Sequence, residues 1–129
     1  MLGSVGKLFR AIVLCGALLS STASAEESAT AAAIADTVTT LAVLANGGSE
    51  YNPLIGSNPV AVVAFGIAKL ALVNYVKDRE EYTGRLKILT GLWSVGAVNN
   101  LLILFGAAGP VALLGGIAGG ITIYNHVKE

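Results

Sequence analysis

The chain has 129 residues, which gives room for a single domain. Hydrophobic residues make up 54% of the chain, charged residues make up 12%, and the mean hydropathy is +0.73. Soluble domains carry about 25% charged residues, so the composition points away from a water-soluble protein and towards a membrane protein. Eight basic and eight acidic residues cancel, which removes the electrostatic basis for nucleic-acid binding.

Residues 1–25 have the three parts of a secretory signal peptide. Lys7 and Arg10 form a basic start, residues 11–19 are apolar, and small residues lead up to Ala25. We expect cleavage after Ala25, leaving a helical membrane domain of residues 26–129. The alternative is an uncleaved signal anchor. Cys15, the one cysteine, lies in this segment, so no disulfide and no cysteine metal site is expected in the mature chain.

The remaining chain predicts an all-α bundle of four short transmembrane helices. We place them at residues 28–46, 59–76, 87–105 and 110–125, separated by segments rich in Gly, Pro, Asn or charge. At about 1.5 Å per residue the later helices are barely long enough for a membrane core of about 30 Å.

The orientation of the bundle is left open by the sequence. The hydrophilic segment 77–87 holds half of the basic residues and would be cytoplasmic by the positive-inside rule. A cleaved signal places Glu26 outside, and a fully crossing first helix then places the same segment outside. We expect four crossings of a bacterial inner (cytoplasmic) membrane.

The positions of Asp36 and Lys69 predict an ion pair within the membrane. Asp36 lies ten residues before Asn46, and Lys69 lies ten residues after Pro59. In two helices joined by the 46–59 turn, both charges lie about 15 Å from that turn, at the same depth. Charges in the membrane interior usually pair or face a cavity. A device that sets helix register, a proton or ion relay, and a small-ligand site all remain open.

Other polar residues are expected near this pair, and together they form the predicted polar centre. We expect the turn at residues 106–110 on the same side of the membrane as the 46–59 turn. The amides of Asn99 and Asn100 then lie at a depth similar to that of Asp36 in the first helix. Amide hydrogen bonds between helices are the simplest role for that pair. A structural turn is favoured over a catalytic carboxylate for residues 50–54. The polar centre comprises Asp36, Thr39, Thr40, Glu50, Asn52, Pro53, Lys69, Asn99 and Asn100.

Small residues in the last helix predict close helix packing. Gly115 with Gly119, and Gly116 with Gly120, form two overlapping G-x-x-x-G pairs, and Ala112 extends one of these faces. The default partner is another helix of the same chain. His126 stands alone at the end of this helix, and the sequence contains no catalytic triad, zinc motif or phosphate loop. No catalytic residue, metal or cofactor is therefore expected.

The polar residues resemble a family of small multi-pass prokaryotic membrane proteins that is known only as a domain of unknown function. The likeness covers roughly residues 30–105. It rests on Asp36-x-x-Thr39-Thr40, on Glu50-x-Asn52-Pro53-Leu54, and on Lys69 in the next helix. The resemblance implies an integral helical domain whose polar residues belong together, and it implies no activity.

The function expected from the sequence is that of a non-enzymatic membrane protein with a buried Asp/Lys centre, acting as an accessory subunit or a small-solute site. Its partners would be the lipid bilayer and either further copies of the chain or a larger membrane complex. The first alternative is a structural or pore-forming oligomer, similar to conjugative pilins or holins. The second is a membrane enzyme that uses Glu50 or Asp36.

Overall fold

The computed structural model describes residues 23–48 and 56–128, and these residues form helices and turns without a strand. The long helices are α2 (Ala25–Ala45), α3 (Pro59–Val76), α4 (Thr83–Leu104) and α5 (Gly109–His126). A short 3-10 helix, η1 (Glu80–Tyr82), precedes α4. The all-helical fold class expected from the sequence is therefore confirmed for the described residues.

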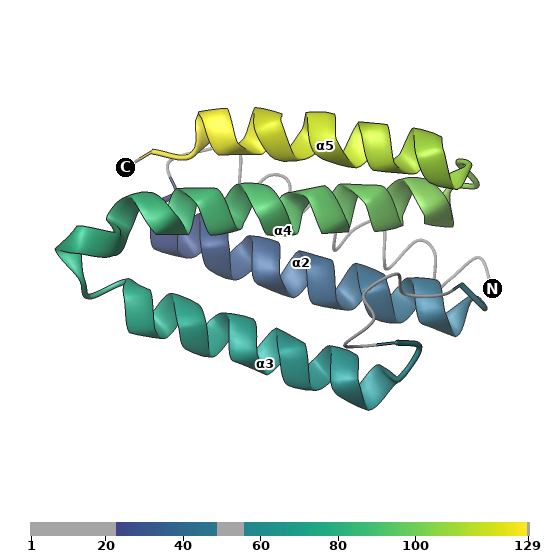
Figure 1. Ribbon diagram of the computed structural model, residues 1–129, viewed down its shortest axis with the longest axis horizontal. Coiled ribbons are helices and arrows are strands. Elements are labelled where there is room, and N and C mark those ends of the chain that lie inside the picture. The colour runs from purple at the N-terminus through teal and green to yellow at the C-terminus, as the bar shows by residue number, and fades with distance from the viewer. Residues whose placement is uncertain (1–22, 49–55, 129) are drawn as a thin grey trace.

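The helices run alternately in opposite directions, with α2 and α4 between α3 and α5 in the view of Figure 1. Helix α4 packs extensively against both α2 and α5, whereas α3 packs mainly against α2. The start of α2, the α3–α4 turn and the end of α5 lie at one end of the bundle (Figure 1). The start of α3 and the α4–α5 turn lie at the other.

Local sequence explains where the helices begin and end. Ser24 caps α2 in a reciprocal capping box, because its hydroxyl accepts from the Glu27 amide and the Glu27 carboxylate accepts from the Ser24 amide. The Asn58 side chain caps α3, with Pro59 in the first turn. Gly47 and Gly106 have φ of +80° and +89°, a conformation in which glycine ends α2 and α4 without strain.

The helix boundaries differ most from expectation at the hydrophilic segment 77–87. Only residues 77–82, which include η1, connect α3 to α4 there, and α4 begins at Thr83, so Arg85 and Lys87 are helical. The helix was expected to start at residue 87 because the apolar residues begin there. Lysine and arginine, however, are good helix formers and can extend their charged ends to water, so the helix starts earlier. Helix α3 has the expected bounds, and the ends of α2 and α5 shift by one to three residues.

Small residues let α5 approach α4 closely. A Cβ built on Gly116 would lie 2.7 Å from the Val95 carbonyl oxygen, and one built on Gly120 would lie 2.7 Å from the Gly91 oxygen. Ala112 on the same face is fully buried. Gly119 also faces α4, at 3.0 Å from the Val98 side chain. The G-x-x-x-G glycines are therefore used within the chain, as the default reading expected.

Three helical segments are long and apolar enough to cross a membrane: Ala25–Ala45, Pro59–Val76 and Glu80–Leu104. The outer surface also carries large apolar side chains. Val60, Ile67, Leu92 and Leu114 are each more than 60% exposed. Large exposed apolar surfaces of soluble proteins mark interaction sites, including membrane contacts, so these side chains support a membrane protein as the helix lengths do.

Charge is concentrated at one end of the bundle. Apart from the pair at Asp36 and Lys69, every described acidic or basic residue lies near the start of α2, the α3–α4 turn, the first turns of α4 or the chain's end. Lys77 contacts Glu26 with an N–O distance of 3.3 Å, which places the start of α2 beside the hydrophilic turn. The described residues of the opposite end carry no charge.

Candidate functional site

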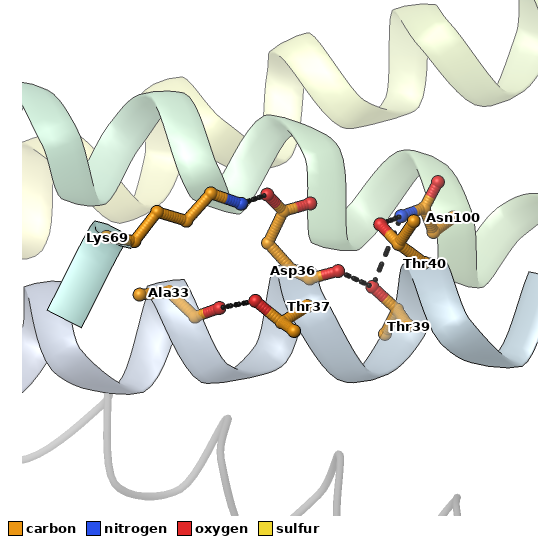
Figure 2. A network of polar contacts seen from close by, with 7 residues as sticks. All are labelled: Ala33, Asp36, Thr37, Thr39, Thr40, Lys69 and Asn100. Atoms are coloured by element: carbon orange, nitrogen blue, oxygen red, sulfur yellow. Dashed lines mark hydrogen bonds and ion pairs between the residues drawn. The ribbon is translucent and has the colours of Figure 1, made fainter. Parts of the chain in front are cut away.

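The candidate site is centred on Asp36 and Lys69. The Lys69 ammonium donates to the Asp36 carboxylate across the α2–α3 interface, so the ion pair expected from the sequence is present (Figure 2). Both residues lie near the middle of their helices, and the side chains of Asp36 and Lys69 are only 16% and 20% exposed. A charge in the membrane interior costs about 2.5–3.5 kcal/mol on insertion scales, and pairing offsets part of that cost.

Two glycines make room for this pair. A Cβ built on Gly96 of α4 would overlap the Asp36 carboxylate, so only glycine lets Asp36 lie against the α4 backbone. A Cβ built on Gly66 of α3 would lie 2.7–2.8 Å from the Thr37 side chain. Thr37 turns its hydroxyl back to the Ala33 carbonyl oxygen at 2.8 Å (Figure 2). Helix α3 can therefore approach α2 at the level of the ion pair.

The aromatic ring of Trp93 lies beside the pair. Lys69 Nζ is 5.9 Å from the centre of the Trp93 ring, at the outer limit of a cation–π contact. Lys69 thus links α2 through Asp36 to α4 through Trp93. The ring and the carboxylate together hold the ammonium in place.

A second polar contact joins α4 to α2 one turn further along. The Asn100 amide donates to the hydroxyls of Thr40 at 2.8 Å and Thr39 at 3.3 Å (Figure 2). Thr39 in turn donates to the Asp36 backbone carbonyl at 3.2 Å. All three side chains are buried, and such interhelical bonds contribute about 0.6 kcal/mol each in membrane proteins. The amide role expected for the asparagine pair is therefore present at Asn100.

Asn99 is placed differently from its neighbour. It is half-buried, and its amide makes one long hydrogen bond of 3.4 Å to Asn100 Oδ1. An amide can make four hydrogen bonds, so Asn99 keeps most of its capacity.

A cavity of about 720 Å³ runs along α4 beside these groups. On α4 it is lined by Trp93, Gly96, Asn99, Asn100 and Ile103, which span about 15 Å of helix. Helix α3 contributes apolar side chains and Lys69, the start of α5 contributes Pro110 and Leu113, and α2 contributes Asp36 and two threonines. Its size lies within the usual range of about 300–1,000 Å³ for small-molecule sites.

Both polar and apolar side chains line the cavity. The polar ones include Asp36, Thr40, Asn99 and Asn100, and the apolar ones include Val62, Phe65, Ile103 and Leu113. The two charges neutralise each other, so the cavity presents no free ion to a ligand. Asn99 is the polar group in it with the most unused hydrogen-bonding capacity.

Not every residue of the predicted polar centre can be placed. Five of its residues line the cavity: Asp36, Thr40, Lys69, Asn99 and Asn100. Thr39 does not line it but accepts a hydrogen bond from the Asn100 amide. Glu50, Asn52 and Pro53 lie outside the described residues, so their role stays a prediction. Ala25 is the first residue of α2.

Trp93, Gly96 and Gly66 were not assigned to the site from the sequence. A signal was available, because residues three or four apart share a helix face. Trp93 lies three residues before Gly96, and Gly96 lies three and four residues before Asn99 and Asn100. Gly66 lies three residues before Lys69. Glycine and tryptophan are common in membrane helices for other reasons, which hid this signal.

No group of three His, Cys, Asp or Glu side chains among residues 23–48 and 56–128 is placed to hold a metal ion. Comparison with models of protein families, with curated proteins and with solved structures finds no match for this chain. The resemblance to the family of small prokaryotic membrane proteins therefore stays a prediction.

Proposed function

We propose that this chain is a non-enzymatic multi-pass protein of the bacterial cytoplasmic membrane that binds a small neutral molecule in the four-helix cavity. The ligand has one hydrogen-bonding group, such as a hydroxyl or carbonyl, on an apolar body. In this proposal α5 is a fourth membrane-embedded helix, since it packs on α4 along its glycines and turns large apolar side chains outward.

The observation that carries the proposal is the cavity itself, whose lining combines two side-chain amides with several apolar side chains. A charged ligand would have to break the Asp36–Lys69 pair to find a counter-ion, at a cost of several kcal/mol. A neutral ligand leaves the pair intact and can bond to the Asn99 amide. Phe65 and Leu113 then cover its apolar part.

The alternative of a structural or pore-forming oligomer loses its main sequence argument, because the tandem glycines of α5 contact α4. The alternative of a membrane enzyme rests on Glu50, which is outside the described residues, or on Asp36, which is bonded to Lys69. Neither alternative gains a supporting observation.

The proposal is tested with Trp93 as the reporter, because it is the chain's one tryptophan and it lines the cavity. Purified protein in detergent is titrated with 1-octanol, octane, octanoate and octylammonium, and Trp93 emission is recorded. Octanol should give a saturable change at a lower concentration than the other three probes. A neutral hydrogen bond contributes about 0.5–1.5 kcal/mol, so the preference of octanol over octane should be about two- to tenfold.

The variant Asn99→Ala should remove the preference for octanol over octane. The matched control Asn74→Ala removes an exposed amide from α3 outside the cavity and should leave the preference unchanged. Failure of all four probes to saturate would contradict the proposed function. Tighter binding of octanoate or octylammonium would contradict the neutral ligand.

A further inference from the structure

A second, shallower groove lies between α4 and α5 on the outer surface of the bundle. Its volume is about 200 Å³, and none of its lining residues lines the four-helix cavity. Gly91 and Gly120 line it where the two backbones are close, since a Cβ built on Gly120 would lie 2.7 Å from the Gly91 carbonyl oxygen. Its walls are Ile88 and Leu92 of α4 and Ile121 of α5, which are 51%, 62% and 57% exposed.

The groove changes character along its length. Tyr124 of α5 lines it near the charged end of the bundle, and Lys87 Nζ lies 4.9 Å from the centre of the Tyr124 ring. From Ile88 the apolar wall of α4 continues to Val95, about 10 Å towards the middle of the helix. The order is therefore cation, tyrosine and apolar channel.

Lys87 is a cation without a carboxylate partner among the described residues. The ion pairs in that part of the chain are Asp36–Lys69 and Glu26–Lys77, and neither involves Lys87. The nearby Arg85 faces a different aromatic ring, at 4.3 Å from the centre of Tyr82. A negative group that approaches the groove from the charged end would therefore meet Lys87 first.

We infer that this groove binds an anionic phospholipid, with its phosphate beside Lys87 and one acyl chain between α4 and α5. Charge complementarity selects the headgroup, because a cation near a membrane surface attracts anionic lipid. The lining selects the tail, because beyond Tyr124 the groove is formed by apolar side chains and glycines, and about 200 Å³ suits a run of methylenes. Tyr124 lies between Lys87 and the apolar part of the groove, and tyrosine is common in the interfacial layer between lipid headgroups and acyl chains.

The experiment is native mass spectrometry of the full chain released from detergent after exchange with defined lipids. Phosphatidylglycerol and phosphatidylcholine with the same acyl chains are compared, together with free glycerol phosphate. The wild-type chain should retain phosphatidylglycerol in preference to phosphatidylcholine, and glycerol phosphate should not compete. Circular dichroism establishes that each variant keeps its helical content, and Lys87→Gln replaces Lys87→Ala if the latter does not fold.

Lys87→Ala should weaken phosphatidylglycerol retention about fivefold, the effect of removing one cation near a membrane surface. Arg85→Ala is the matched control. It also removes one positive charge, but Arg85 lies two residues before Lys87, faces Tyr82 and does not line the groove. It should leave retention unchanged. Leu92→Ser should reduce retention of both lipids, because it removes part of the apolar wall.

Equal losses in Lys87→Ala and Arg85→Ala would show diffuse electrostatic attraction and overturn the site. Retention of phosphatidylcholine as strong as that of phosphatidylglycerol would overturn the headgroup assignment. Competition by glycerol phosphate would show that a free anion is sufficient and would overturn the assignment of the groove to a lipid. A dimer that depends on Leu92, in place of lipid adducts, would assign the groove to a second copy instead. These outcomes do not depend on octanol binding in the four-helix cavity, so the two proposals can fail separately.

Discussion

Gly96 of α4 leaves the space that the Asp36 carboxylate of α2 occupies, because a Cβ at position 96 would overlap Asp36 Oδ1. The missing side chain lets a charged group lie against a helix backbone while Lys69 approaches it from α3. The polar centre thus depends on a residue with no polar atom in its side chain.

Gly96→Ala should therefore destabilise the protein despite the better helix propensity of alanine. Alanine gains about 1 kcal/mol over glycine within a helix, whereas forcing an extra methyl into a packed site costs about 1–3 kcal/mol. The Asp36 side chain must also move, which weakens its pairing with Lys69. Thermal unfolding in detergent should show a lower midpoint for this variant.

The matched control is Gly84→Ala in the first turn of the same helix, where a Cβ meets nothing within 4 Å. That variant should be neutral or more stable. Equal midpoints for the two variants would show that the space at Gly96 is not needed.

Exchanging the charges tests the pairing of Asp36 with Lys69. Asp36→Lys alone places two ammonium groups together, and loss of one partner of a buried ion pair costs about 3–5 kcal/mol. The amount of folded protein in membranes should fall strongly. Adding Lys69→Asp should restore much of it, because opposite charges meet again. Equal depletion in the single and double variants would contradict direct pairing, with membrane abundance measured by immunoblot.

Asn99 and Asn100 should differ in their effect on stability. Asn100→Ala removes two hydrogen bonds to buried threonine hydroxyls and should cost about 1 kcal/mol. Asn99→Ala removes one long bond at the edge of the cavity and should change stability little, although it is expected to alter octanol binding. Unfolding midpoints of the two variants measure the difference. A larger loss for Asn99→Ala would contradict the assignment of roles.

The neighbouring glycines of α5 give a test of helix packing. Gly116→Ala brings a methyl to 2.7 Å from the Val95 carbonyl oxygen, which belongs to a backbone that cannot move without shifting α4. It should destabilise the bundle by about 1–3 kcal/mol. Gly115→Ala meets only the flexible end of the Leu102 side chain, which can rotate away. It should be neutral or stabilising by up to about 1 kcal/mol.

The capping box at the start of α2 bears on signal cleavage. Cleavage after Ala25 would remove Ser24, whose side chain and amide both bond to Glu27. If Ser24 remains attached, Ser24→Ala should lower stability by about 1 kcal/mol, as loss of an N-cap does. The intact mass of the purified protein shows which residue comes first. No stability change in a protein that retains Ser24 would contradict the importance of the cap.

Much of the fold and the centre of the site could be predicted from the sequence. The apolar segments located the helices, since a helix in lipid must satisfy its backbone internally and expose apolar side chains. Equal spacing of Asp36 and Lys69 from one turn located the ion pair, because a constant rise per residue converts sequence distance into depth. The G-x-x-x-G spacing in α5 predicted close packing against another helix, because small residues on one face let two helices approach.

What the sequence left undecided was which side of each helix meets which neighbour. Depth follows from counting residues, but rotation about the helix axis follows from how all the helices pack together. Only the tertiary structure placed Gly96 against Asp36, separated the roles of Asn99 and Asn100, and formed a cavity from side chains of four helices. It also placed Glu26 beside Lys77, which puts the start of α2 and the hydrophilic turn at one end of the bundle.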